Sequence, residues 1–334
     1  MASKTDHKPN ILLIGGAGYV GSHMLRVLLE NKITPVVFDN LSSGFRHFVP
    51  AQVPFFKGDL KKPQDINAVF KKYPITVVMH FASSIVVPES VVNPLKYYDN
   101  NVVSFINLVK AMRQAHVSKI IFSSTAAVYA ELQKIPINED ALLEPNNTYG
   151  QTKLMCEQIL KDTAAADKSF SYVIFRYFNV AGAYDKGSVG ESHEPETHLI
   201  PIVLETALGR RKSLEIYGSN YKTFDGTCVR DYIHVQDLCE AHYLALKEIT
   251  GKARNQIFNL GSQKGFSVKD VIDAARAVTG VDFAVKMSSR RPGDSARLIA
   301  CAKKAKKILG WVPKRSLKQM IASAWEWEKI QEKR

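Results

Sequence analysis

Residues 10–24 read NILLIGGAGYVGSHM, and this stretch decides the fold. The apolar run 11–14 predicts a buried strand, and the pattern over 19–30 predicts a helix directly after it. Gly15, Gly18 and Gly21 lie between the two elements, where glycine permits a sharp turn and a close approach to a ligand. The start of a helix also offers free N–H groups and a partial positive charge. The stretch therefore predicts a binding site for the diphosphate of a dinucleotide.

Short apolar runs alternate with helical patterns through the rest of the first half. Strands are expected at 35–38, 53–56, 76–80, 119–123 and 172–176, and helices at 66–72, 95–115 and 149–165. Strands that alternate with helices in this way form a parallel sheet covered on both faces. We therefore expect an α/β protein with a Rossmann-type, doubly wound parallel sheet.

The pattern becomes more mixed after about residue 180, which suggests a second domain. A loop-rich stretch is expected at 182–197, followed by helices at 199–207, 235–247, 268–278 and 316–327. We expect residues 9–180 to form the Rossmann domain, with the chain returning to it around 228–262. Most of 181–334 should then form a smaller, interleaved mixed α/β domain that binds the substrate.

The composition of the chain argues against several classes of protein but does not point to one function. The chain of 334 residues carries a formal net charge of +13, but the positive residues are scattered and no DNA-binding motif accompanies them. The four cysteines show neither C-x-x-C pairing nor metal-ligand spacing, so we expect reduced thiols and no metal. No apolar run approaches the roughly 18 residues of a membrane span, and MASKTDHKPN does not resemble a secretory signal. We expect a cytoplasmic protein that binds neither nucleic acid nor membranes.

Two acidic residues follow predicted strands on the nucleotide side. Asp39 ends VVFDN, where a carboxylate can accept hydrogen bonds from the adenosine ribose and disfavour a 2′-phosphate. This favours NAD over NADP, although Arg46 lies nearby and could weaken the preference. Asp59 in FKGDL ends the third strand and is a candidate contact for adenine, although alone it would be a turn residue.

The second constellation lies in YGQTK. Tyr149 and Lys153 are four residues apart, so they share one face of the predicted helix. The spacing alone arises readily by accident. In an ordinary amphipathic helix, the Tyr and Lys side chains would cover the core with their apolar parts and place their polar ends in water. Thr125, however, ends the strand KIIFSST, at the edge where open α/β sheets bind ligands. A phenol has a pKa of about 10, and we expect a nearby ammonium and a positive nicotinamide ring to lower it. The trio then predicts proton removal from a carbinol during hydride transfer.

With these motifs the sequence resembles the extended short-chain dehydrogenases and, among them, the UDP-glucose 4-epimerases. The resemblance runs from about residue 10 to 327. It rests on NILLIGGAGYVGSH, VVFDNLSSG, GDL, VVMHFAS, PLKYYDNNV, FSSTAAVY, YGQTKLMCEQIL, RYFNVAGA, THLIP, DGTCVRDYIHVQDL, FNLGS and RRPGD. It implies a tightly bound NAD and inversion of C4 of a UDP-hexose through a transient 4-keto sugar.

The resemblance also implies a role for individual residues. It places the catalytic groups at Thr125, Tyr149 and Lys153. The implied NAD contacts are Gly15, Gly18, Tyr19, Val20, Gly21, Asp39, Asn40, Asp59, Leu60, Phe81, Ala82, Asn100, Ser123, Tyr149, Lys153 and Tyr177. The implied UDP-sugar contacts are Asn179, His198, Leu199, Tyr217, Arg230, Arg291 and Asp294. A homodimer is implied as well, with a seam along helices 95–115 and 149–165, whose apolar faces could equally be core.

Three alternatives remain at this stage. Leu298 falls where some members carry a tyrosine that closes the sugar pocket, so a UDP-N-acetylglucosamine 4-epimerase is possible. A UDP-pentose 4-epimerase is a second alternative, and a non-catalytic NAD-binding sensor is a third, although sensors typically lose the Tyr/Lys pair. A sugar-nucleotide dehydratase is disfavoured, because Ala126 and Ala127 follow Thr125 where elimination requires acid and base groups.

Overall fold

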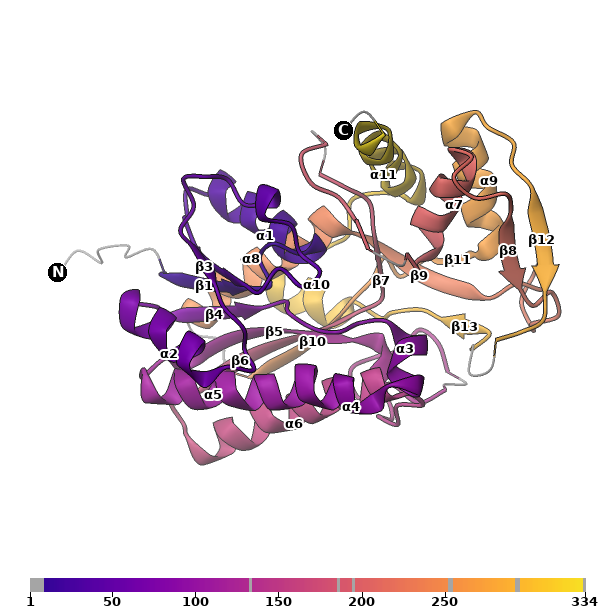
Figure 1. The fold of residues 1–334 in the computed structure, drawn as a ribbon. Helices are drawn as coiled ribbons and strands as arrows, with labels where there is room; N and C mark the ends of the chain where they lie inside the picture. Colours follow the sequence, from indigo (N-terminus) through magenta and orange to yellow (C-terminus); the bar gives the residue numbers. More distant parts are fainter. Residues whose placement is uncertain are drawn as a thin grey trace.

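The computed structural model describes residues 9–131, 134–184, 187–193, 196–251, 255–291 and 295–332. A large sheet with helices on both faces lies beside a region of smaller sheets and helices (Figure 1). None of the helices in these ranges combines the length and the apolar character that a membrane span requires.

The large sheet contains seven parallel strands in the order β10-β6-β5-β4-β1-β2-β3. The strands are β1 (Ile11–Ile14), β2 (Val36–Asp39), β3 (Phe55–Lys57), β4 (Val77–His80), β5 (Lys119–Thr125), β6 (Ser171–Tyr177) and β10 (Gln256–Leu260). The order reverses at β1, since β2 and β3 lie on one side and β4 to β6 on the other. This is the predicted doubly wound α/β sheet, in which ligands bind where the order reverses.

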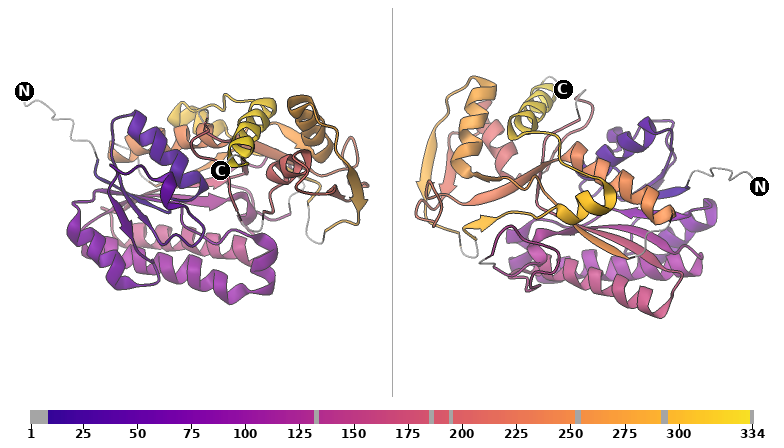
Figure 2. Two further views of the ribbon diagram at one scale, coloured as in Figure 1. Left: turned by 45° about the horizontal axis from the view of Figure 1, so that its top comes forward. Right: turned by 180° about the vertical axis from the view of Figure 1, so that it is seen from behind.

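Helices cover both faces of this sheet, and Figure 2 shows the two layers from other sides. One layer contains α1 (Tyr19–Glu30), α8 (Val235–Thr250) and α10 (Lys303–Leu309). The other contains α2 (Pro63–Lys72), α5 (Ser104–Gln114) and α6 (Thr148–Ala166). The chain therefore returns to the large sheet late, through α8 and β10, after it has entered the smaller region.

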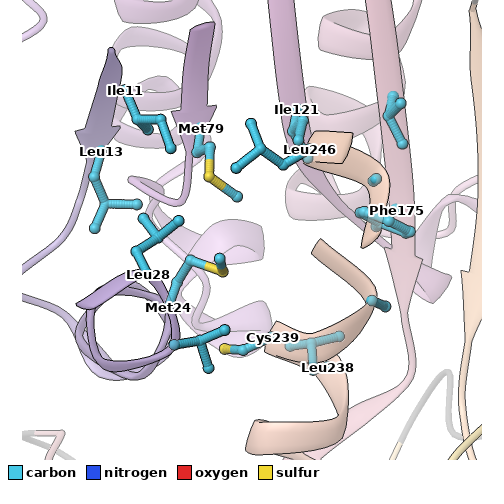
Figure 3. Close-up of a cluster of buried hydrophobic side chains, with 14 of the residues drawn as sticks. Ile11, Leu13, Met24, Leu28, Met79, Ile121, Phe175, Leu238, Cys239 and Leu246 are labelled. Atoms are coloured by element: carbon cyan, nitrogen blue, oxygen red, sulfur yellow. The ribbon is translucent and has the colours of Figure 1, made fainter. Parts of the chain in front are cut away.

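The continuous apolar runs of the strands follow from this double cover. In β1, Ile11 and Leu13 pack against the α1 and α8 layer, whereas Leu12 and Ile14 face the α5 and α6 layer. Successive side chains of a strand point to opposite faces, so both sets must be apolar. Figure 3 shows the first core, where Met24 and Leu28 of α1 meet side chains of the strands and of α8. Each fully buried side chain of this size stabilises the fold by about 1.5–3 kcal/mol.

Among the described residues, the smaller region contains two sheets and three helices. The first sheet consists of β7 (Asn179–Ala181), β9 (Val229–His234), β11 (Gly265–Ser267) and β13 (Arg297–Leu298), and the second of β8 (Leu214–Tyr217) and β12 (Val285–Ser288). Its helices are α7 (Leu199–Ala207), α9 (Val268–Thr279) and α11 (Leu317–Gln331). These elements share a third apolar core, to which α7, α9 and α11 all contribute. Short 3₁₀ turns lie at η1 (Arg46–Phe48) and η3 (Ala126–Val128).

The predicted helix 95–115 differs most from its expectation. It is divided into α4 (Pro94–Tyr97), a π-helical turn η2 (Tyr98–Val103) and α5, and the short helix α3 (Val87–Val92) precedes it. The π turn carries Asn101, whose carboxamide hydrogen-bonds the backbone N–H and C=O of Ser84 at 2.8 and 3.0 Å. A π turn holds more residues than an α-helical turn, and hydropathy periodicity does not reveal it. Through Asn101, this turn ties the helix to the loop after β4. The strand expected at 53–56 was also misplaced by one to two residues, since β3 spans Phe55–Lys57.

Candidate active site

The parallel strands bring the predicted residues to one edge of the large sheet. The carboxyl ends of β1, β4, β5 and β6 lie side by side, because these four strands are neighbours. Gly15 follows β1, Phe81 follows β4, Thr125 ends β5 and Tyr177 ends β6. Residues far apart in sequence therefore meet at the position where an open α/β sheet binds its ligand.

The glycine turn after β1 has no room for side chains at Gly15 and Gly21. Gly15 has φ +73°, and a Cβ atom there would lie 2.6 Å from the backbone nitrogen of Ala82. A Cβ on Gly21 would lie 2.1 Å from the carbonyl oxygen of Gly15. Gly18 is the N-cap of α1, forms no side-chain cap, and would place its Cβ no closer than 3.5 Å to its neighbours. The start of α1 thus leaves backbone N–H groups accessible to an anion, which fits the diphosphate of NAD.

The Asp39 carboxylate is held beside this turn by two backbone donors. Its Oδ2 accepts from the N–H of Ala17 at 2.9 Å and its Oδ1 from the N–H of Leu41 at 2.8 Å. Burial raises the pKa of Asp39, and these two hydrogen bonds oppose the rise. Each oxygen keeps a further lone pair, so the carboxylate can still accept from a ribose hydroxyl. The side chain of Asn40 accepts from the N–H of Ser42 in the adjoining turn.

The side chains of the other predicted NAD contacts differ in their burial and in the hydrogen bonds that they already form. Asp59 accepts from the N–H of Lys61 at 2.9 Å, which is also the turn role considered for it. Leu60 is buried in the core between the sheet and α5, so only its backbone could reach a ligand. The Asn100 amide donates to Ser84 Oγ at 3.0 Å. In the first turn of α1, Tyr19 donates its hydroxyl to the carbonyl of Gly182 at 2.5 Å and is followed by Val20.

Tyr149 and Thr125 meet because the start of α6 packs closely on the turn after β5. The Asn147 side chain caps α6 by accepting from the N–H of Gly150 at 2.9 Å. A Cβ on Gly150 would lie 2.3 Å from the carbonyl oxygen of Ala127, so only glycine permits this approach. A hydrogen-bonding interaction with the Thr125 side chain lowers the pKa of the Tyr149 phenol. The two side chains that the sequence predicts to handle the proton therefore lie near each other.

Lys153 is buried one turn further along the same face of α6. Its ammonium donates to the carbonyl of Ser123 at 2.9 Å and lies 5.0 Å from the ring centre of Phe122. Burial lowers the pKa of Lys153 to about 8, and Cys156 and Glu157 oppose the fall.

The expected acidification of Tyr149 does not appear in the protein alone. Burial raises the pKa of Tyr149 to about 12, and only the hydrogen bond with Thr125 acts in the opposite direction. The physical reason is that loss of water penalises the phenolate more than the neighbouring groups stabilise it. Without an additional positive charge in the site, this phenol remains protonated at neutral pH.

A buried ion pair behind the reacting edge was not anticipated from the sequence. Glu157 accepts from Arg176 Nε at 2.9 Å, from Arg176 Nη2 at 2.6 Å and from Ser124 Oγ at 2.6 Å. The same guanidinium donates to the hydroxyl of Tyr129 at 2.9 Å. The available signal was an arginine inside the otherwise apolar strand SYVIFRY, which requires a buried acceptor.

A buried histidine supports Tyr177 at the end of β6. The Tyr177 hydroxyl lies between Ser123 Oγ, at 2.7 Å, and Nε2 of His242, at 2.6 Å. Burial lowers the pKa of His242 to about 4, and its Nδ1 lies 2.9 Å from the carbonyl of Leu238. A carbonyl can only accept, so Nδ1 carries the proton and Nε2 accepts from Tyr177. Sequence reasoning missed His242, because α8 reaches the site only through the fold.

The predicted substrate residues are distributed over the smaller region. The guanidinium of Arg291 lies over the ring of Tyr217, 4.6 Å from its centre. Arg230, on β9, donates to the carbonyls of Val229 and Ser295 at 3.0 and 2.7 Å. Asn179 begins β7, whereas His198 and Leu199 lie at the N-cap and first turn of α7. Asp294 lies outside the described residues.

Comparisons with known proteins agree with this arrangement. Residues 11–261 match the NAD dependent epimerase/dehydratase family. A UDP-glucose 4-epimerase of Halalkalibacterium halodurans is 47% identical over 320 residues, which cover 96% of this chain and 95% of the relative.

Two solved structures show the same likeness. The UDP-glucose 4-epimerase from Brucella ovis, in complex with NAD, is 41% identical with a TM-score of 0.92, and covers 96% of this chain and 98% of its own. The UDP-Glc/GlcNAc 4-epimerase from Campylobacter jejuni is 43% identical with a TM-score of 0.86, and covers 97% of this chain and 100% of its own.

Proposed function

The chain belongs to the NAD dependent epimerase/dehydratase family, and from this premise we propose that it is a UDP-glucose 4-epimerase. It interconverts UDP-glucose and UDP-galactose by inverting C4 of the hexose. The observation that carries the proposal is the proximity of Tyr149 to Thr125, whose side chain lowers the pKa of the phenol, with Lys153 buried on the same face of α6. NAD is the cofactor, and the relatives named above match the chain over nearly its full length.

Tyr149 and Thr125 perform the proton transfer. NAD, when bound, supplies a reversible hydride acceptor for C4 and a positive ring charge that favours the phenolate. Tyr149 takes the proton of the C4 hydroxyl, and Thr125 lowers the pKa of the phenol. Once the 4-keto sugar has rotated and its other face would regain the hydride at C4, the same phenol returns the proton to O4, which gives the opposite epimer.

We assign to Lys153 and Tyr177 the task of orienting the cofactor at the sheet edge. Lys153 donates to the carbonyl of Ser123, and its remaining N–H groups would hold the cofactor ribose. Tyr177 is fixed by Ser123 and His242, and its ring would line the site for the nicotinamide.

The nucleotide must be held firmly while the hexose turns. We assign the diphosphate to Arg230 and Arg291, because guanidinium groups match phosphate oxygens. Tyr217 provides an aromatic face for uracil, and Arg291 already stacks on it. Asn179, His198, Leu199 and Asp294 complete the proposed substrate contacts.

Leu298 gives a specific reason to consider N-acetylated sugars as second substrates. It pairs in register with Arg230, so a half-buried aliphatic side chain lines the strand next to a proposed diphosphate contact. The Campylobacter jejuni relative is described as a UDP-Glc/GlcNAc 4-epimerase. We expect Leu298→Tyr to reduce use of UDP-N-acetylglucosamine more than use of UDP-glucose.

The decisive experiment incubates purified protein with NAD and, separately, UDP-glucose, UDP-N-acetylglucosamine and UDP-xylose, and resolves the products by chromatography. Formation of UDP-galactose supports the proposal. Conversion only of the N-acetylated sugar or of the pentose would replace it with that specificity. Binding of NAD without conversion of any UDP-sugar would leave a non-catalytic sensor.

We further propose that the protein is a homodimer. Apolar side chains remain exposed on neighbouring elements α3, α4, η2 and α6, and their exposed fractions are 61% for Val91, 82% for Val92, 77% for Leu95, 47% for Val103 and 38% for Met155. Such a patch on a chain of this size favours contact with a second copy. Sedimentation should show a dimer for the natural sequence and a monomer for Leu95→Glu.

The proposed compartment is the cytoplasm, since the four cysteines are free thiols and three of them are buried. We also propose that residues 9–180, with 228–262, form the NAD-binding domain. Most of 181–334 then forms the UDP-sugar-binding domain.

A further inference from the structure

Two histidines and two glutamates converge in the segment between β7 and α7. One potential ligand atom from each of Glu191, His193, Glu196 and His198 lies within 4.8 Å of the other three. His198 is also a proposed substrate contact, whereas nothing in the proposed reaction uses the other three.

The histidine–glutamate separations in this cluster are close to those of a tetrahedral metal site. Nδ1 of His198 lies 2.9 Å from Oε1 of Glu191 and 2.9 Å from Oε1 of Glu196. Nδ1 of His193 lies 3.3 Å from Oε1 of Glu191 and 3.7 Å from Oε2 of Glu196. Ligands at about 2.1 Å from a tetrahedral zinc ion are separated from one another by about 3.4 Å. All four histidine–glutamate separations fall close to that value.

Ordinary ion pairs explain only part of this geometry. A single N–H points toward one acceptor, and Nδ1 of His198 hydrogen-bonds Oε1 of Glu196, yet Oε1 of Glu191 lies at the same distance of 2.9 Å. Nδ1 of His193 is buried and forms no hydrogen bond of acceptable geometry with the described residues. Both Nδ1 atoms, Oε1 of Glu191 and the two oxygens of Glu196 thus lie close together, and two carboxylates balance the charge of one divalent cation.

The surroundings hold the carboxylates as metal sites require. The exposed side-chain fractions are 8% for Glu191, 5% for Glu196 and 20% for His193. Oε1 of Glu196 accepts from the backbone N–H groups of Thr197 and His198, both at 2.7 Å. Such outer hydrogen bonds orient carboxylate ligands before an ion arrives.

We propose that Glu191, His193, Glu196 and His198 form a structural zinc site. Two imidazole nitrogens and two carboxylate oxygens suit Zn²⁺, and four protein ligands close the tetrahedron, so no position remains for catalysis. Each imidazole donates its Nδ1 lone pair and carries its proton on Nε2. The ion would tie the segment before α7 into one unit. That segment is anchored to α11, because Trp327 Nε1 donates to the carbonyl of Glu191 at 2.8 Å.

The test uses the full chain without a histidine tag, treated with a chelator, dialysed and saturated with NAD. Titration with ZnCl₂ in a calorimeter, with metal analysis of the dialysed product, should give one zinc per chain. His193→Gln and Glu196→Gln should each weaken zinc binding by roughly a hundredfold or more, since each removes one ligand. The matched control His116→Gln, at an exposed histidine on a different part of the surface, should bind zinc as the natural chain does.

Cobalt gives a readout that a folding defect in a variant cannot imitate. Co²⁺ bound to the natural chain should produce the intense visible absorption of a tetrahedral complex, which excess Zn²⁺ abolishes. The inference is overturned if the natural chain binds no stoichiometric zinc, or if both variants retain its affinity. A weak, octahedral cobalt spectrum would contradict it as well. None of these outcomes depends on epimerase activity.

Discussion

Replacement of Glu157 by glutamine should remove a large part of the protein's stability. The Glu157 side chain is fully buried and accepts three hydrogen bonds, two of them from Arg176, which is 1% exposed. In the variant, one amide oxygen can still accept from Arg176 Nε and Ser124 Oγ. The amide NH₂ then faces Arg176 Nη2, and because both groups are hydrogen-bond donors, this hydrogen bond is lost. The guanidinium also loses its counter-charge.

Breaking a buried ion pair on one side costs about 3–5 kcal/mol, because an uncompensated charge stays buried. The equilibrium constant for folding should therefore fall by roughly a hundredfold to several thousandfold. Urea unfolding at pH 7 with excess NAD, followed by circular dichroism, measures this change through the midpoint at an unchanged slope. Glu144→Gln, an exposed glutamate, is the matched control and should change stability by less than about 0.5 kcal/mol.

The double variant Glu157→Leu with Arg176→Met tests the physical cause. Removal of both charges leaves no buried ion without a partner, so the double variant should lose less stability than the sum of Glu157→Leu and Arg176→Met. A loss below about 1 kcal/mol in Glu157→Gln would refute the reasoning. So would strict additivity in the double variant.

Three further predictions follow from the site. Tyr149→Phe should lower turnover by roughly 10²–10⁴-fold but retain NAD, because only the group that carries the proton is lost. Tyr73→Phe is the control and should keep full turnover. A fully active Tyr149→Phe variant would show that the phenol does not transfer the proton. Gly15→Ala should destabilise the protein and weaken NAD binding, because its Cβ would lie 2.6 Å from the nitrogen of Ala82 at φ +73°. Gly280→Ala is the control, because Gly280 has φ +72° but a Cβ there would have no atom within 4 Å. Equal losses of stability in Gly15→Ala and Gly280→Ala would contradict the packing argument. For Lys153, a folded pKa of about 8, below the ordinary 10.5, means that the unfolded chain binds more protons between these values. The free energy of unfolding relative to Lys153→Met should then rise from pH 8 to 10, by up to about 1.4 kcal/mol per pH unit, and a fall over that window would disprove the lowered pKa.

The sequence by itself determined the class of fold and predicted the reacting groups. Apolar runs of strand length, a glycine turn and a Tyr/Lys pair on one helical face are local patterns, so each can be read without knowledge of distant contacts. The doubly wound sheet and the membership of the epimerase family were confirmed. The catalytic residues and the NAD and substrate contacts that were assigned residue by residue stay predictions.

Only the tertiary structure decided which side chains meet across the chain. Glu157 and Arg176 pair through the packing of α6 on β6, and His242 reaches Tyr177 because α8 returns to the large sheet. The pKa of Tyr149 rises through burial in the protein alone, which sequence cannot measure, and the expectation that it falls beside the nicotinamide ring stays a prediction. The convergence of His193 and His198 on two glutamates likewise depends on backbone turns between β7 and α7. Periodicity reports the environment of each residue along its own element, whereas contacts between elements depend on the whole fold.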